Sequence, residues 1–126
     1  MSGVTYDAGA LVAAERNWRE VWAVHRRALE RGLRPTVPAG VLGQAWRGGP
    51  QAELSRLLKG CRIEELDEVR GRAAGQACGR AGTSGVIDGA VVVGALARGD
   101  LVVTADPKAI AKIADGLDAS VEIVAI

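Results

Sequence analysis

The sequence predicts an α/β fold in which a central parallel β-sheet is flanked by helices on both faces. Short β-type runs alternate with helical stretches along the whole chain, which is the pattern of parallel strands joined by crossover helices. Glycine and proline stand at several of the boundaries between these runs. The length of 126 residues suffices for one hydrophobic core but not for separate catalytic and substrate domains. We therefore expect a single domain over residues 1–126.

The strands are expected near residues 4–6, 35–37, 61–66, 101–104 and 121–125. The helices are expected near residues 9–15, 18–31, 38–47, 50–59, 67–81, 85–98 and 106–116. Gly32 follows the second helix, Pro38 opens the third, RGGP at 47–50 separates the third from the fourth, and Gly99 precedes the strand LVVT. Ligands of open α/β sheets bind beyond the carboxyl ends of the strands, so we expect the functional site at that edge.

The composition is that of an ordinary folded protein, with 48% hydrophobic and 25% charged residues. Asp7 and Glu15 interrupt the N-terminal stretch, and the apolar run GAVVVGALA is far shorter than the about 20 residues of a membrane span. We therefore expect a cytoplasmic protein without a membrane partner. Cys61 and Cys78 form no C-x-x-C motif, which favours buried, reduced thiols over a disulfide or a zinc site.

Positive charge is concentrated in the first half of the chain. Residues 1–62 contain ten Lys or Arg against five Asp or Glu, whereas residues 63–126 contain six against ten. Much of the excess lies in the expected second helix, which includes Arg26 and Arg27. These arginines either attract phosphates or an acidic protein segment, or form a solvated helix face.

Two aspartates are expected at strand ends. Asp7 follows the first strand, where burial of a lone carboxylate would be costly. Asp106 follows the strand LVVT, shortly after Thr104 and directly before Pro107. Taken alone, Asp106 is well explained as a helix N-cap, because Asp caps helices and Pro favours the first helical turn.

Asp88 is the only charged residue in the apolar stretch TSGVIDGAVVVGALA. No Lys, Arg or His lies within one helical turn of it, and a buried carboxylate needs partners. Either a shared cation satisfies it, or it pairs with a distant arginine or hydrogen-bonds near the helix N-terminus. Asp7, Asp88 and Asp106 could together hold Mg²⁺ or Mn²⁺, which prefer oxygen ligands. Such an ion can activate water and orient a scissile phosphate, which is nuclease-like chemistry.

Other chemistries receive little support from the sequence. His25 is the single histidine and lies among arginines, which disfavours a Ser-His-Asp or Cys-His device and a histidine-based zinc site. The run GAVVVGA at 89–95 lacks the Lys-Ser/Thr of a phosphate-binding loop, so its glycines are better explained by close helix packing.

Four sequence blocks, taken in order, resemble the PIN-domain family and in particular the VapC-type toxin ribonucleases of bacterial toxin-antitoxin pairs. These blocks are YDAGALVA, VPAGVLGQAWRGG, GTSGVIDGAVVVGA and LVVTADPKAI, and they span essentially the whole chain. The resemblance implies a PIN-like fold and a Mg²⁺- or Mn²⁺-dependent endoribonuclease that leaves a 5′-phosphate and a 3′-hydroxyl. It also implies a cognate antitoxin protein and a homodimer.

By this resemblance, Asp7, Asp88 and Asp106 match the metal-binding acids, and Thr104 matches the hydroxyl residue that accompanies the last acid. Gln44 stands where many family members have a glutamate, and Gly85 stands where an additional acid is expected. An amide oxygen can ligate a cation but brings no charge, so Gln44 predicts reduced metal affinity or activity. The alternative function is a catalytically weakened PIN-like module that binds a protein partner or RNA without cleaving it.

Arginines and tryptophans are expected to form two binding surfaces. We expect Arg47, together with Arg26 and Arg27, to attract RNA in a salt-dependent way. The tryptophans Trp18, Trp22 and Trp46 could line a groove for an antitoxin helix. The alternative is core packing, because a chain without phenylalanine needs other large apolar residues inside.

Overall fold

A five-stranded sheet forms the centre of the computed structural model, which describes residues 3–126. The strands are β1 (Val4–Tyr6), β2 (Thr36–Pro38), β3 (Arg62–Glu64), β4 (Leu101–Thr104) and β5 (Ile123–Ala125). Their order is β3-β2-β1-β4-β5, and each neighbouring pair is parallel. All five carboxyl ends therefore lie at one edge of the sheet.

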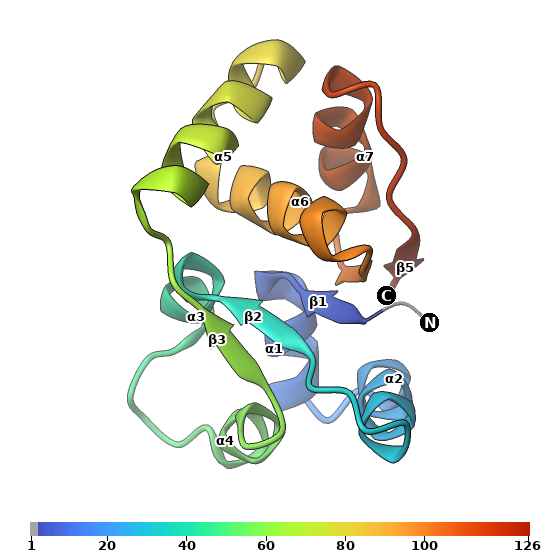
Figure 1. Cartoon of the computed structure of the whole chain (residues 1–126). Coiled ribbons are helices and arrows are strands. Elements are labelled where there is room, and N and C mark those ends of the chain that lie inside the picture. Colours follow the sequence, from blue (N-terminus) through green and yellow to red (C-terminus); the bar gives the residue numbers. More distant parts are fainter. Residues whose placement is uncertain (1–2) are drawn as a thin grey trace.

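Helices cover both faces of this sheet. They are α1 (Ala8–Glu15), α2 (Arg19–Glu30), α3 (Ala39–Ala45), α4 (Ala52–Leu58), α5 (Glu68–Ala81), α6 (Val86–Arg98) and α7 (Pro107–Gly116). Figure 1 shows α5, α6 and α7 on one side of the strands and α1, α2 and α4 on the other. The predicted fold class is confirmed as α/β with a parallel sheet between two helical layers. Within residues 3–126, no helix combines the length and the apolar character needed to pass through a lipid bilayer.

Several predicted elements are shorter than expected, among them the helix expected over 50–59, which is Ala52–Leu58, and the strand expected over 121–125, which is Ile123–Ala125. The third strand, expected over 61–66, comprises only Arg62–Glu64, because its neighbour β2 ends at Pro38, the residue paired with Glu64. The third helix is expected over 38–47, but Pro38 is the extended last residue of β2, with φ −60° and ψ 142°. That helix ends at Ala45, because the backbone of Trp46 returns to an extended conformation with ψ 130°.

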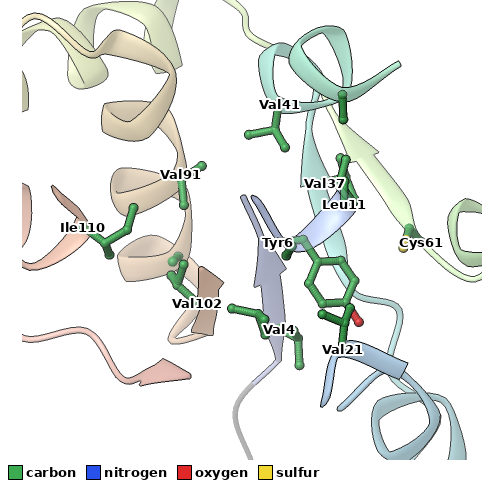
Figure 2. Packing of buried hydrophobic residues seen from close by; sticks show 14 of the residues in the cluster. Val4, Tyr6, Leu11, Val21, Val37, Val41, Cys61, Val91, Val102 and Ile110 are labelled. Carbon is green, nitrogen blue, oxygen red and sulfur yellow. The ribbon is translucent and has the colours of Figure 1, made fainter. Parts of the chain in front are cut away.

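One hydrophobic cluster connects the sheet with both helical layers. Figure 2 shows Val91 and Ile110 beside Val102 on the side of α6 and α7, and Val21 beside Tyr6 on the opposite side. Tyr6 is fully buried and is the largest of the completely buried side chains in the described residues. Cys61 and Cys78 are both buried and free, as predicted.

Gly89, directly after Asp88, allows α5 and α6 to pack closely, as the sequence predicted for the glycines of this run. A Cβ atom at Gly89 would lie 2.8 Å from the Ala74 carbonyl oxygen and 2.9 Å from Cys78 Sγ. Gly89→Ala is therefore expected to reduce the free energy of unfolding by about 1–3 kcal/mol, because overpacking forces the helices apart.

Chemical denaturation of Gly89→Ala beside Gly75→Ala tests this prediction. Gly75 lies inside α5, and a Cβ atom there would meet nothing within 4 Å, so alanine at this position should be neutral or stabilising. Equal stability changes in the two variants would contradict the packing argument.

Candidate functional site

The three predicted acids lie at or near the carboxyl ends of β1 and β4, which are neighbours in the sheet. Asp7 directly follows β1, and its amide donates to the Val103 carbonyl oxygen of β4 at 3.2 Å. Asp106 lies two residues beyond β4 and caps α7 through its side chain. Asp88 lies in the first turn of α6, which packs against both strands.

Asp7 is held by hydrogen bonds at both carboxylate oxygens. Its Oδ1 accepts from the Ala10 amide at 2.9 Å, so Asp7 is the N-cap of α1, and its Oδ2 accepts from the Thr104 hydroxyl. The same Thr104 oxygen accepts from the Asp106 amide at 2.8 Å. Thr104 is completely buried and Asp7 is only 5% exposed, so this hydroxyl fixes the first acid relative to the loop that carries the third.

The Asp7 carboxyl has an elevated pKa. Burial is the main cause, and the charge of Asp106 acts in the same direction. The hydrogen bonds from Thr104, Ala10 and Ala105 lower the pKa without cancelling the effect of burial. Asp7 is therefore a carboxylate whose negative charge is only partly compensated by its surroundings.

Asp88 is half-buried, and its carboxylate has no hydrogen-bond or ion-pair partner among residues 3–126. Burial raises its pKa, and the charges of Asp7 and Asp106 raise it further. Both alternative explanations of Asp88 are therefore wrong. Within residues 3–126 it pairs with no distant arginine, and it accepts no hydrogen bond near the N-terminus of α6.

Other acids in the interior of the protein are paired. The three-acid edge, formed by Asp7, Asp88 and Asp106, differs from them in this respect. Asp100 is 8% exposed and accepts from Arg98 Nε at 2.9 Å and from the Thr5 hydroxyl at 2.8 Å. Glu64 also forms an ion pair with Arg98. No ion pair within residues 3–126 involves Asp7, Asp88 or Asp106. Repulsion among like charges at this edge would be relieved by a cation.

The donor set fits a divalent ion that prefers oxygen ligands, but the carboxylates are not drawn together into a ready-made cluster. Among the residues that the structure describes, no three His, Cys, Asp or Glu side chains lie close enough to hold a metal ion. Metal binding by Asp7, Asp88 and Asp106 therefore stays a prediction, supported by their shared edge and by the coupling of their charges.

Gly9 is a contributor that the sequence analysis missed. A Cβ atom at Gly9 would lie 2.4 Å from Ala105 Cβ, in the loop between β4 and α7. The missing side chain lets the first turn of α1 approach this loop, and so brings Asp7 and Asp106 to the same place. The only signal in the sequence was the run of small residues after Asp7.

Gln44 lies on the exposed part of α3, and no hydrogen bond joins its side chain to the three acids within residues 3–126. Its predicted supporting role therefore stays a prediction. Arg47 folds back onto α3, where its guanidinium donates to the carbonyl oxygens of Gly43 at 3.1 Å, Trp46 at 2.8 Å and Gln44 at 2.8 Å. These bonds give Arg47 a structural task at the C-terminus of α3.

Arg26 and Arg27 are exposed on α2, away from the acids. Arg27 lines a cavity with Val4 and Leu101, the first residues of β1 and β4. It therefore lies at the amino ends of the strands, whereas Asp7 follows a carboxyl end. An RNA that contacts both these arginines and the three acids would have to extend from one end of the strands to the other. The RNA contact stays a prediction.

The tryptophans are not core residues as a group. Trp18 and Trp46 are 43% and 42% exposed, so the core-packing alternative is wrong for both. Trp22 is half-buried, and its indole Nε1 donates to the Ala14 carbonyl oxygen at 3.1 Å. The predicted antitoxin groove remains a prediction, favoured by the exposed apolar area of Trp18 and Trp46.

Neither models of known protein families nor curated protein sequences yield a match to this chain. The site must therefore be judged by its own chemistry. It offers carboxylate oxygens from three elements, two of them on carboxyls whose pKa is raised by burial and neighbouring charge. Such an arrangement can bind a divalent cation and, through it, a phosphate ester.

Proposed function

We propose that this protein is a Mg²⁺- or Mn²⁺-dependent endoribonuclease of the PIN-domain type, acting as the toxin of a toxin-antitoxin pair. The observation that carries the proposal is the position of Asp7, Asp88 and Asp106, which have no basic partner among residues 3–126, near the carboxyl ends of β1 and β4 in a parallel sheet. Burial, and to a lesser extent neighbouring charge, raises the pKa of Asp7 and of Asp88. The four sequence blocks and their order support the choice of family. A homodimer and a cognate antitoxin belong to the same proposal.

The residues of the chain have distinct tasks in this proposal. Asp7 is held in one orientation by Ala10 and Thr104, so it provides a fixed oxygen. Asp88 has no competing partner in the described residues and can turn toward an ion, and Asp106 is exposed to solvent. When bound, a divalent ion supplies a Lewis acid that polarises the phosphate and activates water. Thr104 is a positioning residue, because it acts through Asp7 and the Asp106 loop.

The second candidate is a PIN-like module that binds a partner or RNA without cleaving. Gln44 favours it, because this residue brings no charge and makes no side-chain hydrogen bond to the acids within the described residues. The two candidates differ in whether the protein binds a divalent ion through Asp7.

Calorimetric titration of Mn²⁺ into the protein without antitoxin separates the candidates. We expect the wild type to bind, and Asp7→Asn to bind at least about tenfold more weakly, because Asn lacks the charge that the ion compensates. Asp67→Asn is the matched control, since Asp67 also caps a helix, with Oδ1 2.8 Å from the Arg70 amide, but lies at α5. It should bind Mn²⁺ as the wild type does.

Cleavage of a mixed RNA pool in Mn²⁺, read by the 5′-phosphate of the products, completes the test. Absence of Mn²⁺ binding in the wild type would exclude the proposed nuclease mechanism and favour the non-cleaving module. Binding that is equal in Asp7→Asn and the wild type would place the ion elsewhere.

A further inference from the structure

A second candidate binding site lies in a solvent-open pocket of about 380 Å³ between the end of α1, α2 and α4. Its lining residues are Asn17, Trp22, His25, Arg26, Leu29 and Arg56. The volume lies in the range of ligand sites, roughly 300–1,000 Å³. The lining carries several N–H donors and no acidic side chain, which is the reverse of the three-acid edge.

His25 presents a nitrogen donor to this pocket. The Tyr6 hydroxyl, which is fully buried, lies 2.9 Å from His25 Nδ1 and has no other side-chain partner among residues 3–126. Burial keeps the pKa of Tyr6 far above its usual value, so the phenol keeps its proton. Since Nδ1 is its only side-chain partner in the described residues, we assign the hydroxyl as the donor and Nδ1 as the acceptor. Burial and the charge of Arg56 lower the pKa of His25. The neutral ring must then carry its proton on Nε2.

The Nε2 edge of His25 lies beside Gly60. A Cβ atom at Gly60 would lie 3.0 Å from Nε2 and close this approach. Nε2 has no hydrogen-bond partner within residues 3–126, and His25 as a whole is only 3% exposed, so solvent reaches a small part of this side chain. His25 is one of the residues that line the pocket, so a ligand there would meet the small exposed part of its ring.

Two arginines add positive charge beside this donor. Arg26 is exposed and forms no ion pair within the described residues. Arg56 lies with its guanidinium carbon 3.8 Å from the centre of the Trp22 ring, which orients its N–H groups. Its pair with Glu53 is exposed, with 58% and 37% of the two side chains accessible, so this pair competes only weakly with a ligand.

We propose that this pocket binds a phosphate group through His25 Nε2–H, Arg26 and Arg56, with Trp22 as its wall. Donors from two helices line one space, and guanidinium N–H groups pair well with the oxygens of a phosphate. The phosphate belongs either to an RNA backbone or to a free phosphorylated molecule. The inference does not depend on metal binding by the three acids.

The single histidine makes the site directly observable by ¹⁵N NMR of the imidazole ring, with EDTA present throughout. We expect Nδ1 to have the shift of an unprotonated nitrogen and Nε2 that of a protonated one. Inorganic phosphate should move the Nε2 and Trp22 indole signals in a saturable way, whereas sodium chloride of equal ionic strength should not. A reversed tautomer, or equal shifts with chloride, would overturn the proposal.

Variants at neighbouring arginines supply a matched control. Arg26→Gln and Arg56→Gln should each weaken phosphate binding at least about fivefold. Arg27→Gln makes the same charge change on the same helix but lies at a different cavity, so its affinity should stay at the wild-type value. If Arg26→Gln and Arg27→Gln weaken phosphate binding equally, the effect comes from the overall charge of the helix, and the proposed site is wrong.

A short RNA oligonucleotide, added in EDTA so that it is not cleaved, distinguishes the sources of the phosphate. The RNA backbone is identified if the oligonucleotide moves the same signals at a concentration at least about tenfold lower than inorganic phosphate needs, because several phosphates then act together. If the oligonucleotide needs a concentration equal to or higher than that of inorganic phosphate, the ligand is a free phosphorylated molecule. If neither phosphate nor RNA moves these signals, the site is excluded, whatever the outcome of the Mn²⁺ titration.

Discussion

The Asp88→Asn variant is expected to unfold at a higher temperature than the wild type in metal-free buffer, and to cleave RNA about 1,000-fold more slowly in Mn²⁺. Asp88 makes no hydrogen bond or ion pair within residues 3–126, so asparagine removes repulsion and burial of a charge. It loses only the favourable interaction of that charge with the N-terminus of α6, which is the smaller effect. The gain in the free energy of unfolding should be on the order of 1 kcal/mol, as is common when a residue kept for function is replaced.

The pH dependence of stability has a definite sign for this residue. The folded protein raises the pKa of Asp88 above its ordinary value of 3.8, so the folded state binds more protons than the unfolded state between these two values. The stability of the wild type should therefore fall as the pH rises from about 3.8 through the raised pKa. Asp7 contributes a change of the same sign.

Thermal unfolding of wild type and Asp88→Asn at several pH values, with EDTA and with Mn²⁺, checks this prediction. The two curves should converge at low pH, where both side chains are neutral, and separate as the pH rises. Mn²⁺ should reverse the order by stabilising only the wild type. Asp67→Asn serves as the control, because loss of a charge at the N-terminus of α5 should lower stability slightly. A lower stability of metal-free Asp88→Asn at neutral pH would show that Asp88 is a structural residue.

The sequence was sufficient to place the acids at one edge of the sheet, because that placement depends on local signals. Apolar runs end at Asp7 and near Asp106, and the same residues carry the N-cap pattern seen in α1 and α7. Once both strands are parallel neighbours, their carboxyl ends must meet. Asp88 was singled out because no basic residue lies within one helical turn of it, but its place near the other two acids was implied only by the family resemblance.

The tertiary contacts could not be predicted, because they join residues that are distant in the chain. Thr104 donates to Asp7 across 97 positions of sequence, and no local pattern specifies that partner. Size alone favours the core for Trp18 and Trp46, but small side chains such as Ala14 and Ala77 fill much of the interior. Composition gives the total apolar volume and does not say which large residue remains at the surface.

The paired and unpaired acids together indicate what the site has been kept for. The pair of Asp100 with Arg98 shows that this chain compensates a buried carboxylate where structure alone is at stake. Asp7 and Asp88 have no basic partner within residues 3–126, which costs stability, and natural sequences tolerate such a cost mainly at functional sites. This contrast favours a cation-dependent function over a purely structural role for the three acids.

Gly9→Ala is expected to separate the acids without altering any of them. The new Cβ would lie 2.4 Å from Ala105 Cβ. Side-chain adjustment cannot relieve this overlap, so the backbone of α1 or of the loop between β4 and α7 must move. We expect a loss of about 1–3 kcal/mol in the free energy of unfolding and at least about a tenfold loss of Mn²⁺ affinity. Denaturation and calorimetry measure the two effects separately.

A second substitution tests the cause. In Gly9→Ala/Ala105→Gly the clashing methyl group is gone, and the next atoms of residue 105 lie at 3.2 Å and 3.4 Å, which requires only a small adjustment. The double variant should therefore recover most of the lost Mn²⁺ affinity, although Ala105→Gly alone should cost some stability through backbone entropy. If the double variant binds Mn²⁺ no better than Gly9→Ala, the contact between α1 and this loop does not set the geometry of the site. Recovery would mean that a close approach of two backbone segments, and not only three carboxylates, defines the cation site.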